Sequence, residues 1–148
     1  MLGQNFDDLS SHVIPGLMNR MHHAKLNNDP KVVVWGSGEP MREFLYVDDM
    51  AEASLFIHNL DKAEYESNTE KMLSHVNIGA GKDITIRELS EIIKEVVGFD
   101  GLLKFDANMP DGSPRKLMDI QRLKDLGWQA NTSLRNGIEL SYTDFLKS

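Results

Sequence analysis

The sequence alternates short apolar runs with longer segments in which apolar residues recur every three or four positions. Val32-Val33-Val34 is a run of β-branched residues next to turn-forming residues, which favours a buried strand. Ile86–Val97 instead places its apolar residues on one helical face, and Gly98 follows as a stop. Strands interleaved with helices along one chain predict an α/β fold.

The same reasoning predicts the boundaries of the other elements. The predicted strands share apolar or β-branched composition and are Lys31–Trp35, Met41–Val47, Ser74–Ile78 and Leu102–Phe105. Helix starts are marked by residues whose side-chain oxygens accept from backbone N–H groups. These are Ser11, Asp48 or Asp49, Thr85, Asp119 and Ser133. Thr85 and Glu88 also have the spacing of a capping box, in which each side chain binds the backbone of the other.

Composition excludes several classes of function. The 148 residues contain no cysteine, which rules out disulfides, cysteine-ligated zinc, iron–sulfur clusters and thiol nucleophiles. The net charge of -7 is unfavourable for binding the backbone of a nucleic acid. The N-terminal residues lack the pattern of a signal peptide, and no segment approaches the ~20 apolar residues of a membrane span. We therefore expect one cytoplasmic domain that binds neither nucleic acid nor membranes.

Two glycine pairs have part of a dinucleotide-binding pattern. Gly36-Ser37-Gly38 follows a strand, but another strand comes next where the pattern requires a helix. Gly79-Ala80-Gly81 precedes a helix, but Ile84 occupies the third glycine position and Thr85 is the predicted cap. Both pairs are therefore predicted to be turn glycines. No metal site is expected either, because the five histidines lack metal-ligand spacing.

Cationic and aromatic residues near predicted loops are the best candidates for a site. Arg20 lies where a helix becomes polar, Trp35 ends a strand, and Arg42 begins the next strand. The turn-rich segment Asp111–Lys116 ends in two further cations. Arginine binds phosphate through a two-pronged fork and lysine as a point charge, so these residues could form a local anion pocket. The alternative is that the charges are solvated surface groups and that Trp35 belongs to the core.

Four blocks of sequence resemble the GDP-L-fucose synthase family, whose members are extended short-chain dehydrogenases/reductases. They are Ser11–Pro15 (Ser-His-Val-Ile-Pro), Val32–Phe44 (Val-Val-Val-Trp-Gly-Ser-Gly-Glu-Pro-Met-Arg-Glu-Phe), Val47–Ala51 and Asp111–Lys116. The resemblance runs in register from His12 to the end of the chain. It implies an NADPH-dependent enzyme that epimerises a keto sugar, GDP-4-keto-6-deoxy-D-mannose, at two carbons and then reduces its ketone.

The resemblance also assigns roles to residues of this chain. It implies that His12 is an acid in the epimerisation and lies beside the nicotinamide, so His12 is both the catalytic and the cofactor-binding candidate. Without the resemblance, His12 is simply a residue at a helix start. The positions implied to contact substrate are Arg20, Trp35, Arg42, Asp111 and Lys116. Residues 1–10 are expected to be a polar loop, and residues 11–148 a single sugar-nucleotide-binding domain.

Parts of the family pattern are missing from these 148 residues. The family has a glycine-rich cofactor loop, a catalytic cysteine and a Tyr-x-x-x-Lys pair, whereas the residues four places after Tyr46, Tyr65 and Tyr142 are Met50, Thr69 and Leu146. The resemblance therefore implies the C-terminal, substrate-binding portion of the α/β fold, with short strands and without the main Rossmann half. NADP(H) is expected to bind this chain weakly or not at all. Alternatives are an assembly module for a separately encoded N-terminal half, or a folded remnant without activity.

Overall fold

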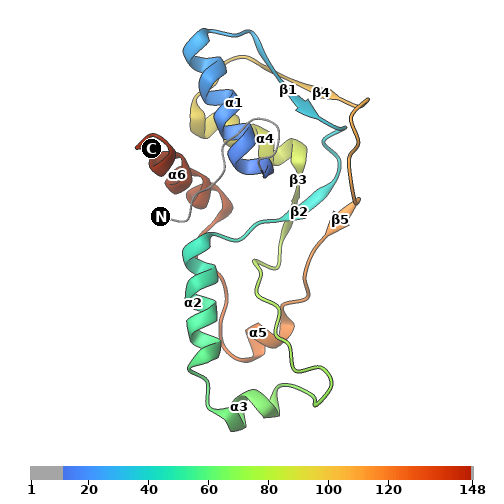
Figure 1. The fold of residues 1–148 in the computed structure, drawn as a ribbon, viewed down its shortest axis with the longest axis vertical. Helices are drawn as coiled ribbons and strands as arrows, with labels where there is room; N and C mark the ends of the chain where they lie inside the picture. The colour runs from blue at the N-terminus through green and yellow to red at the C-terminus, as the bar shows by residue number, and fades with distance from the viewer. Residues whose placement is uncertain (1–11, 148) are drawn as a thin grey trace. The chain divides into compact units, whose positions relative to one another are not determined.

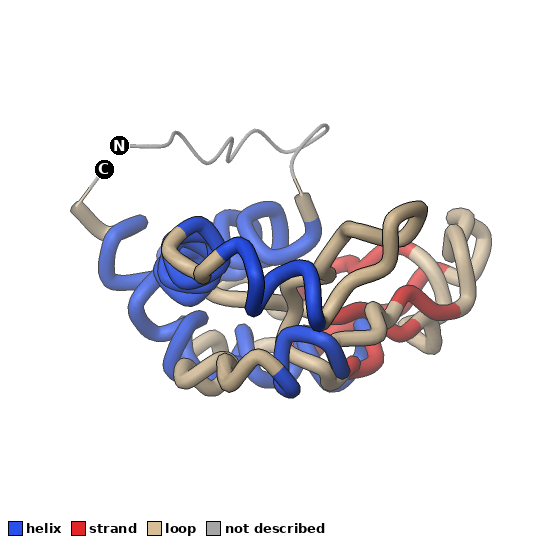
Figure 2. The backbone as a smooth tube through the Cα atoms, turned by 90° about the horizontal axis from the view of Figure 1, so that it is seen from below, coloured by secondary structure: helices blue, strands red, loops and turns tan. Residues whose placement is uncertain are grey.

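The computed structural model describes residues 12–147, so the predicted polar loop at residues 1–10 lies outside the described part. The chain divides into two compact units. Unit 1 comprises the described parts of Met1–Met41, Ile84–Pro114 and Ile138–Ser148, and unit 2 comprises Arg42–Asp83 and Arg115–Gly137. Figure 2 shows that strands make up a smaller part of the backbone than helices do. This confirms the α/β class with short strands that the sequence predicts.

Unit 1 is built on two parallel strands, β1 (Lys31–Trp35) and β4 (Leu102–Asp106). Their register pairs Val32 with Leu103 and Val34 with Phe105. Parallel strands need a long connection, and here it includes helix α4 (Ile86–Val97). Helix α1 (Val13–Asn27) precedes β1 and lies beside α4 in Figure 1. Both strands and the helix between them confirm the sequence prediction closely.

Apolar side chains from all these elements form the core of unit 1. The buried side chains come from α1, β1, α4, the second residue after α4 and helix α6 (Leu134–Phe145). They include Leu17, Met18, Met21, Val34, Leu89, Ile93, Val97, Phe99 and Ile138. Burial of each large aliphatic side chain contributes roughly 1.5–3 kcal/mol. The helical spacing of these residues in the sequence is what brings them to one face.

Helix α4 has the start and stop that the sequence predicts. Thr85 Oγ1 accepts from the Glu88 N–H at 3.1 Å, and the Thr85 N–H donates to Glu88 Oε2 at 3.1 Å, which completes the capping box. At the other end, Gly98 has φ 70°, a left-handed conformation that glycine adopts without a Cβ clash. Both ends therefore follow from local sequence alone.

Unit 2 contains helices α2 (Val47–His58), α3 (Lys62–Ser67) and α5 (Gln121–Asp125). Its apolar centre is small and consists of Ala53, Leu123 and Trp128, with partly buried side chains packed around them. The short strands β2 (Met41–Glu43), β3 (Asp83–Thr85) and β5 (Arg115–Lys116) pair in the order β3-β2-β5. They lie where the chain passes from one unit to the other.

Two predicted helix starts are wrong, because the N-cap of α1 is His12 and not Ser11, and that of α5 is Ile120 and not Asp119. The structure also corrects three predicted elements that lie at least partly in unit 2. The predicted strand Ser74–Ile78 is irregular, because side chains and not a neighbouring strand bind its backbone. The predicted strand Met41–Val47 is shortened to Met41–Glu43. Helix α2 begins at Val47, so Asp49 lies in its first turn and does not cap it. Instead the Asp49 carboxylate accepts two hydrogen bonds from Thr132, at 2.9 and 3.0 Å.

No helix within residues 12–147 combines the length and the hydropathy that crossing a membrane requires.

Candidate functional site

A hollow of about 400 Å³ lies in unit 1 between the second half of α1 and strand β1. This volume is within the ~300–1,000 Å³ range of small-molecule sites. The residues around it come from α1, from the turn that follows it and from β1. They are Arg20, His23, Ala24, Asp29, Lys31, Val32, Val33 and Trp35.

A tight turn brings these elements together. The C-cap of α1, Asn28, has φ 56°, and the Asp29 N–H donates to the Ala24 carbonyl at 2.8 Å. Pro30 then ends the turn and β1 begins at once. Because so few residues separate helix and strand, the last turns of α1 lie next to β1. The turn forms one wall of the hollow through Asp29.

The hollow combines an aromatic surface with charged groups. Along β1 the side chains of Lys31, Val33 and Trp35 are exposed, while those of Val32 and Val34 are buried. Trp35 is 48% exposed and Val33 38% exposed, so Trp35 is not a core residue. A tryptophan ring can stack on a flat heterocycle, and an arginine can bind an anion beside it. The lining therefore suits a ligand with both a planar ring and a negative group.

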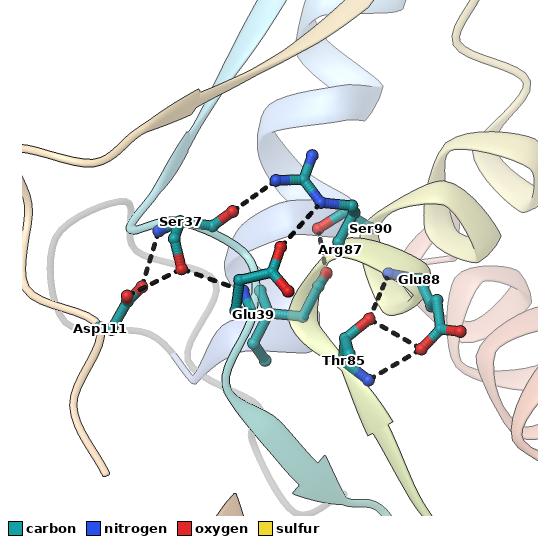
Figure 3. Close-up of polar contacts among 8 residues, drawn as sticks. Ser37, Glu39, Thr85, Arg87, Glu88, Ser90 and Asp111 are labelled. Carbon is teal, nitrogen blue, oxygen red and sulfur yellow. Dashed lines mark hydrogen bonds and ion pairs between the residues drawn. The ribbon is translucent and has the colours of Figure 1, made fainter. Parts of the chain in front are cut away.

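The turn after Trp35 is anchored by Asp111 (Figure 3). The Ser37 N–H donates to Asp111 Oδ1 at 2.7 Å, and the Ser37 hydroxyl donates to Oδ2 at 2.8 Å. Gly36 has φ 86°, and a Cβ at this position would lie 2.3 Å from Asp111 Oδ1. Only glycine fits there, which confirms that Gly36 is a turn glycine.

Arg87 holds the same turn from α4. Its Nη2 donates to the Ser37 carbonyl at 2.6 Å, and its guanidinium lies 4.0 Å from the centre of the Phe105 ring (Figure 3 shows the first contact). Phe105 belongs to β4, so the turn is bound to both α4 and the strand beside β1. These contacts fix the end of β1 that carries Trp35.

The structure distributes the predicted site residues between the two units. It brings Arg20 and Trp35 together at the hollow and ties Asp111 to the turn that follows Trp35. His12 is exposed at the N-cap position of α1, where its carbonyl accepts from the Gly16 N–H at 3.0 Å. Arg42 on β2 and Lys116 on β5 belong to unit 2.

Lys116 and its neighbour Arg115 differ in their surroundings. Arg115 Nε donates to Asp83 Oδ2 at 2.5 Å and its Nη2 to Oδ1 at 3.2 Å. This hydrogen bonding holds the pKa of the Asp83 carboxyl below its ordinary value. Lys116 is exposed, and its ammonium makes no ion pair with residues 12–147. Of the two cations that end the Asp111–Lys116 segment, Arg115 is thus engaged within the protein.

Sequence reasoning missed three polar residues of the hollow: His23, Asp29 and Lys31. The alternation of β1 is the one pattern that could have identified Lys31, because it places Lys31 on the same side as Trp35. His23 and Asp29 carry no such pattern, since one is an exposed helix residue and the other a turn residue. Within residues 12–147, no three His, Asp or Glu side chains gather into a metal-binding group.

Comparison with known proteins gives a consistent result. Residues 1–79 match the profile of the NAD dependent epimerase/dehydratase family. The chain is 53% identical to GDP-L-fucose synthase of Escherichia coli (strain K12) over 144 residues, which are 97% of this chain and 45% of that protein. It is 52% identical to GDP-L-fucose synthase 1 of Arabidopsis thaliana, covering 97% of this chain and 42% of that protein.

A solved structure has the same fold. The GDP-L-fucose synthetase from Naegleria fowleri, bound to NADP, superimposes with a TM-score of 0.79 at 26% identity, covering 97% of this chain and 42% of that one. The chain thus spans less than half the length of these relatives. The resemblance inferred from the four sequence blocks is confirmed, as is an α/β fold corresponding to part of an extended short-chain dehydrogenase/reductase.

Proposed function

The chain belongs to the NAD dependent epimerase/dehydratase family, and from this premise we propose that it is the GDP-sugar-binding portion of a GDP-L-fucose synthase. Such an enzyme converts GDP-4-keto-6-deoxy-D-mannose to GDP-L-fucose by epimerisation and NADPH reduction. The observation that carries the proposal is the hollow of unit 1, where Arg20 and Trp35 lie together. A nucleoside diphosphate sugar has the planar base and the anionic diphosphate that this lining suits.

The other residues implied by the resemblance are part of the same proposal. Arg42 and Lys116 are proposed to contact substrate, and Asp111 to contribute to substrate binding through the turn that it anchors at Ser37. His12 is proposed as the proton-transferring residue, because an imidazole has both protonation states available near neutral pH.

NADP(H), the cofactor of the parent family, does not fit the described residues. A dinucleotide requires a glycine-rich loop and free N–H groups at a helix start. At α4 the capping box already binds the Glu88 N–H. Hydrogen bonds from Thr85 hold the pKa of Glu88 below its ordinary value, so an ionised carboxylate lies where a phosphate would have to bind. We therefore expect this chain to bind NADP weakly or not at all, and we derive no reduction step from it.

Isothermal titration calorimetry of the chain with GDP, GDP-mannose and NADP tests the proposal. GDP and GDP-mannose are expected to bind with the higher affinity, and the affinity should fall as salt rises because exposed charges contribute. NADP binding as tight as GDP-mannose binding would contradict the proposal.

Arg20→Ala should weaken GDP binding by roughly 1.5–3 kcal/mol, the value of hydrogen bonds to charged groups. Arg20→Lys should restore only part of this, because lysine lacks the planar fork. Lys71→Ala, which removes an exposed cation of unit 2 that does not line the hollow, is the control and should bind GDP like the parent. Equal GDP affinity of Arg20→Ala and the parent would show that Arg20 is a solvated charge.

A second candidate function is assembly with a separately encoded N-terminal half of a family member. The exposed side of the β1–β4 pair favours it, because parallel sheets are usually covered on both faces, whereas Leu102 is 72% exposed here. Co-expression with the remaining portion of a family member should yield a complex that oxidises NADPH. In that complex, His12→Asn should slow substrate hydrogen exchange with deuterated water by about 10²–10⁴. Failure of the two portions to associate would contradict this function.

A further inference from the structure

We propose that Asp29 and Lys31 select the nucleobase, and that the pair favours guanine over adenine. The inference rests on the proposed function, because it requires that a nucleotide occupies the hollow of unit 1. It adds two residues that neither the sequence blocks nor the family resemblance assigns to any role.

The residues that line the hollow differ in chemistry from one end of β1 to the other. Lys31 and Trp35 are four residues apart on one side of β1, which corresponds to about 13 Å of extended strand. Trp35 therefore lies at one end of the part of the lining that β1 supplies, and Lys31 lies at the other, next to the turn that holds Asp29. The chain reverses direction between α1 and β1, as Figure 1 shows, so Asp29 lies at the closed end of this hairpin-like junction. A nucleotide is long enough to contact both ends.

The charged groups at the Asp29 end are available for a ligand. With residues 12–147, the Asp29 carboxylate forms neither a hydrogen bond nor an ion pair, and the same holds for the Lys31 ammonium. The fixed contact of Asp29 is made by its backbone N–H, which donates to the Ala24 carbonyl. The backbone thus holds the residue in place while the side chain remains unengaged. Val33, between the two ends, offers an apolar surface to a ring.

Guanine has the complementary set of groups. A carboxylate only accepts hydrogen bonds, and an ammonium only donates them. Guanine presents the O6 acceptor next to the N1–H and N2–H₂ donors, so its O6 can accept from Lys31 while its two donors bind Asp29. Adenine presents a donor and then an acceptor along the same edge, which places its N1 lone pair against the carboxylate. Hypoxanthine keeps O6 and N1–H but lacks the 2-amino donor.

The simpler interpretation is that Asp29 is a turn residue and Lys31 a solvated strand-start lysine. This interpretation predicts no difference between bases. Calorimetry of the whole chain with GDP, IDP and ADP separates the two. We expect GDP to bind most tightly, IDP more weakly, and ADP about ten- to a hundredfold more weakly than GDP.

The key variant is Asp29→Asn, which keeps the backbone N–H contact and the shape of the side chain. It should lower GDP affinity by about ten- to a hundredfold and leave ADP affinity unchanged or raised. Lys31→Met should also lower the affinity for GDP more than the affinity for ADP. Glu91→Gln, at an exposed carboxylate on α4 that does not line the hollow, is the matched control for charge and should keep the parental preference. Circular dichroism confirms that each variant is folded.

The outcomes separate this inference from the proposed function. If the parent chain binds none of the three nucleotides, the proposed function fails and the inference falls with it. If GDP binds but Asp29→Asn keeps the parental ratio of GDP to ADP affinity, the inference alone is overturned. A folded Asp29→Asn variant that loses GDP and ADP affinity equally also overturns it, because Asp29 would then act without regard to the base.

Discussion

In unit 1, helices and strands pack apolar faces together, whereas in unit 2 long-range polar contacts hold irregular segments in place. The core of unit 1 draws buried side chains from α1, β1, α4 and α6. Unit 2 buries fewer apolar side chains, namely Ala53, Ile120, Leu123, Leu126 and Trp128. Unit 2 relies more on carboxylates that bind distant backbone groups, a kind of contact that unit 1 has between Asp111 and Ser37. Glu43 accepts from the Gly81 N–H at 2.6 Å and from the Met118 N–H at 3.0 Å.

The stability of the two units should therefore be sensitive to different kinds of substitution. An apolar core resists the loss of one polar contact but not the loss of side-chain volume. A structure held by carboxylates bound to N–H groups is vulnerable at each carboxylate, because its removal leaves buried donors without a partner. The following predictions test that contrast, beginning with the largest effect.

Ile93→Ala should have the largest effect, because it opens a cavity in the core of unit 1. Ile93 is fully buried on α4, and such truncations cost about 2–5 kcal/mol. Urea unfolding should show this loss in the free energy of unfolding. Glu91→Ala, on the exposed side of the same helix, is the control and should change stability by no more than about 0.5 kcal/mol. Equal free energies of unfolding for the two variants would show that burial of Ile93 does not stabilise unit 1.

Asp49→Ala should destabilise unit 2 by about 1–3 kcal/mol. The carboxylate is 4% exposed, and its loss leaves the N–H and hydroxyl of Thr132 without their acceptor. Asp49→Asn should cost less, because one oxygen remains. The adjacent and exposed Asp48 gives the control: Asp48→Ala should cost at most about 1 kcal/mol, the value of a charge at a helix start. If Asp48→Ala and Asp49→Ala cost the same, the contact with Thr132 contributes little.

Acidification should have the smallest effect on stability, and it should affect unit 1 at a higher pH than unit 2. Burial, then the charges of His23 and Lys25, lower the pKa of His22 in unit 1, whose Nδ1 lies 2.9 Å from the Tyr142 hydroxyl. A lowered pKa means that the unfolded state binds the proton more readily, so stability is present above pH 6.5 and falls as the pH drops below it. In unit 2, hydrogen bonding by Arg115 lowers the pKa of Asp83, so the stability that the Asp83 carboxylate contributes is lost only below about pH 3.8.

The measurement is Tm as a function of pH for the parent and for His22→Gln. Between pH 7.5 and 5.5 the parent should lose Tm, and the variant should lose less over the same interval. Arg115→Gln should leave this interval unchanged, because the Arg115–Asp83 pair titrates at lower pH. If Tm of His22→Gln falls with pH as steeply as that of the parent, a group other than His22 titrates between pH 7.5 and 5.5.

The contrast between the units also explains what the sequence could predict. Helix α4 and strands β1 and β4 follow from apolar periodicity, a β-branched run and a capping box, all of which are local. The segment Ser74–Ile78 has the composition of a strand but is held by Arg122, which donates to the carbonyls of Leu73 and His75. No local pattern reveals a partner that lies more than forty residues away in the chain.

The same limit applies to the candidate site. Arg20 and Trp35 could be proposed because cations and aromatic residues stand near predicted loops and because the four sequence blocks resemble a family. Asp29 and Lys31 could not, since their proximity depends on how tightly α1 turns into β1. The Asp111–Ser37 contact was equally hidden, because 74 residues separate the two.

The central claim is that unit 1 carries the nucleotide-binding hollow, and hydrogen–deuterium exchange of the chain with and without saturating GDP tests it most directly. Exchange is expected to slow in residues 20–35, where α1, the turn and β1 line the hollow. The exposed helix α3 of unit 2 should be unaffected and serves as an internal reference. If GDP binds and the exchange of residues 20–35 does not change, the hollow is not the nucleotide site and the account is wrong.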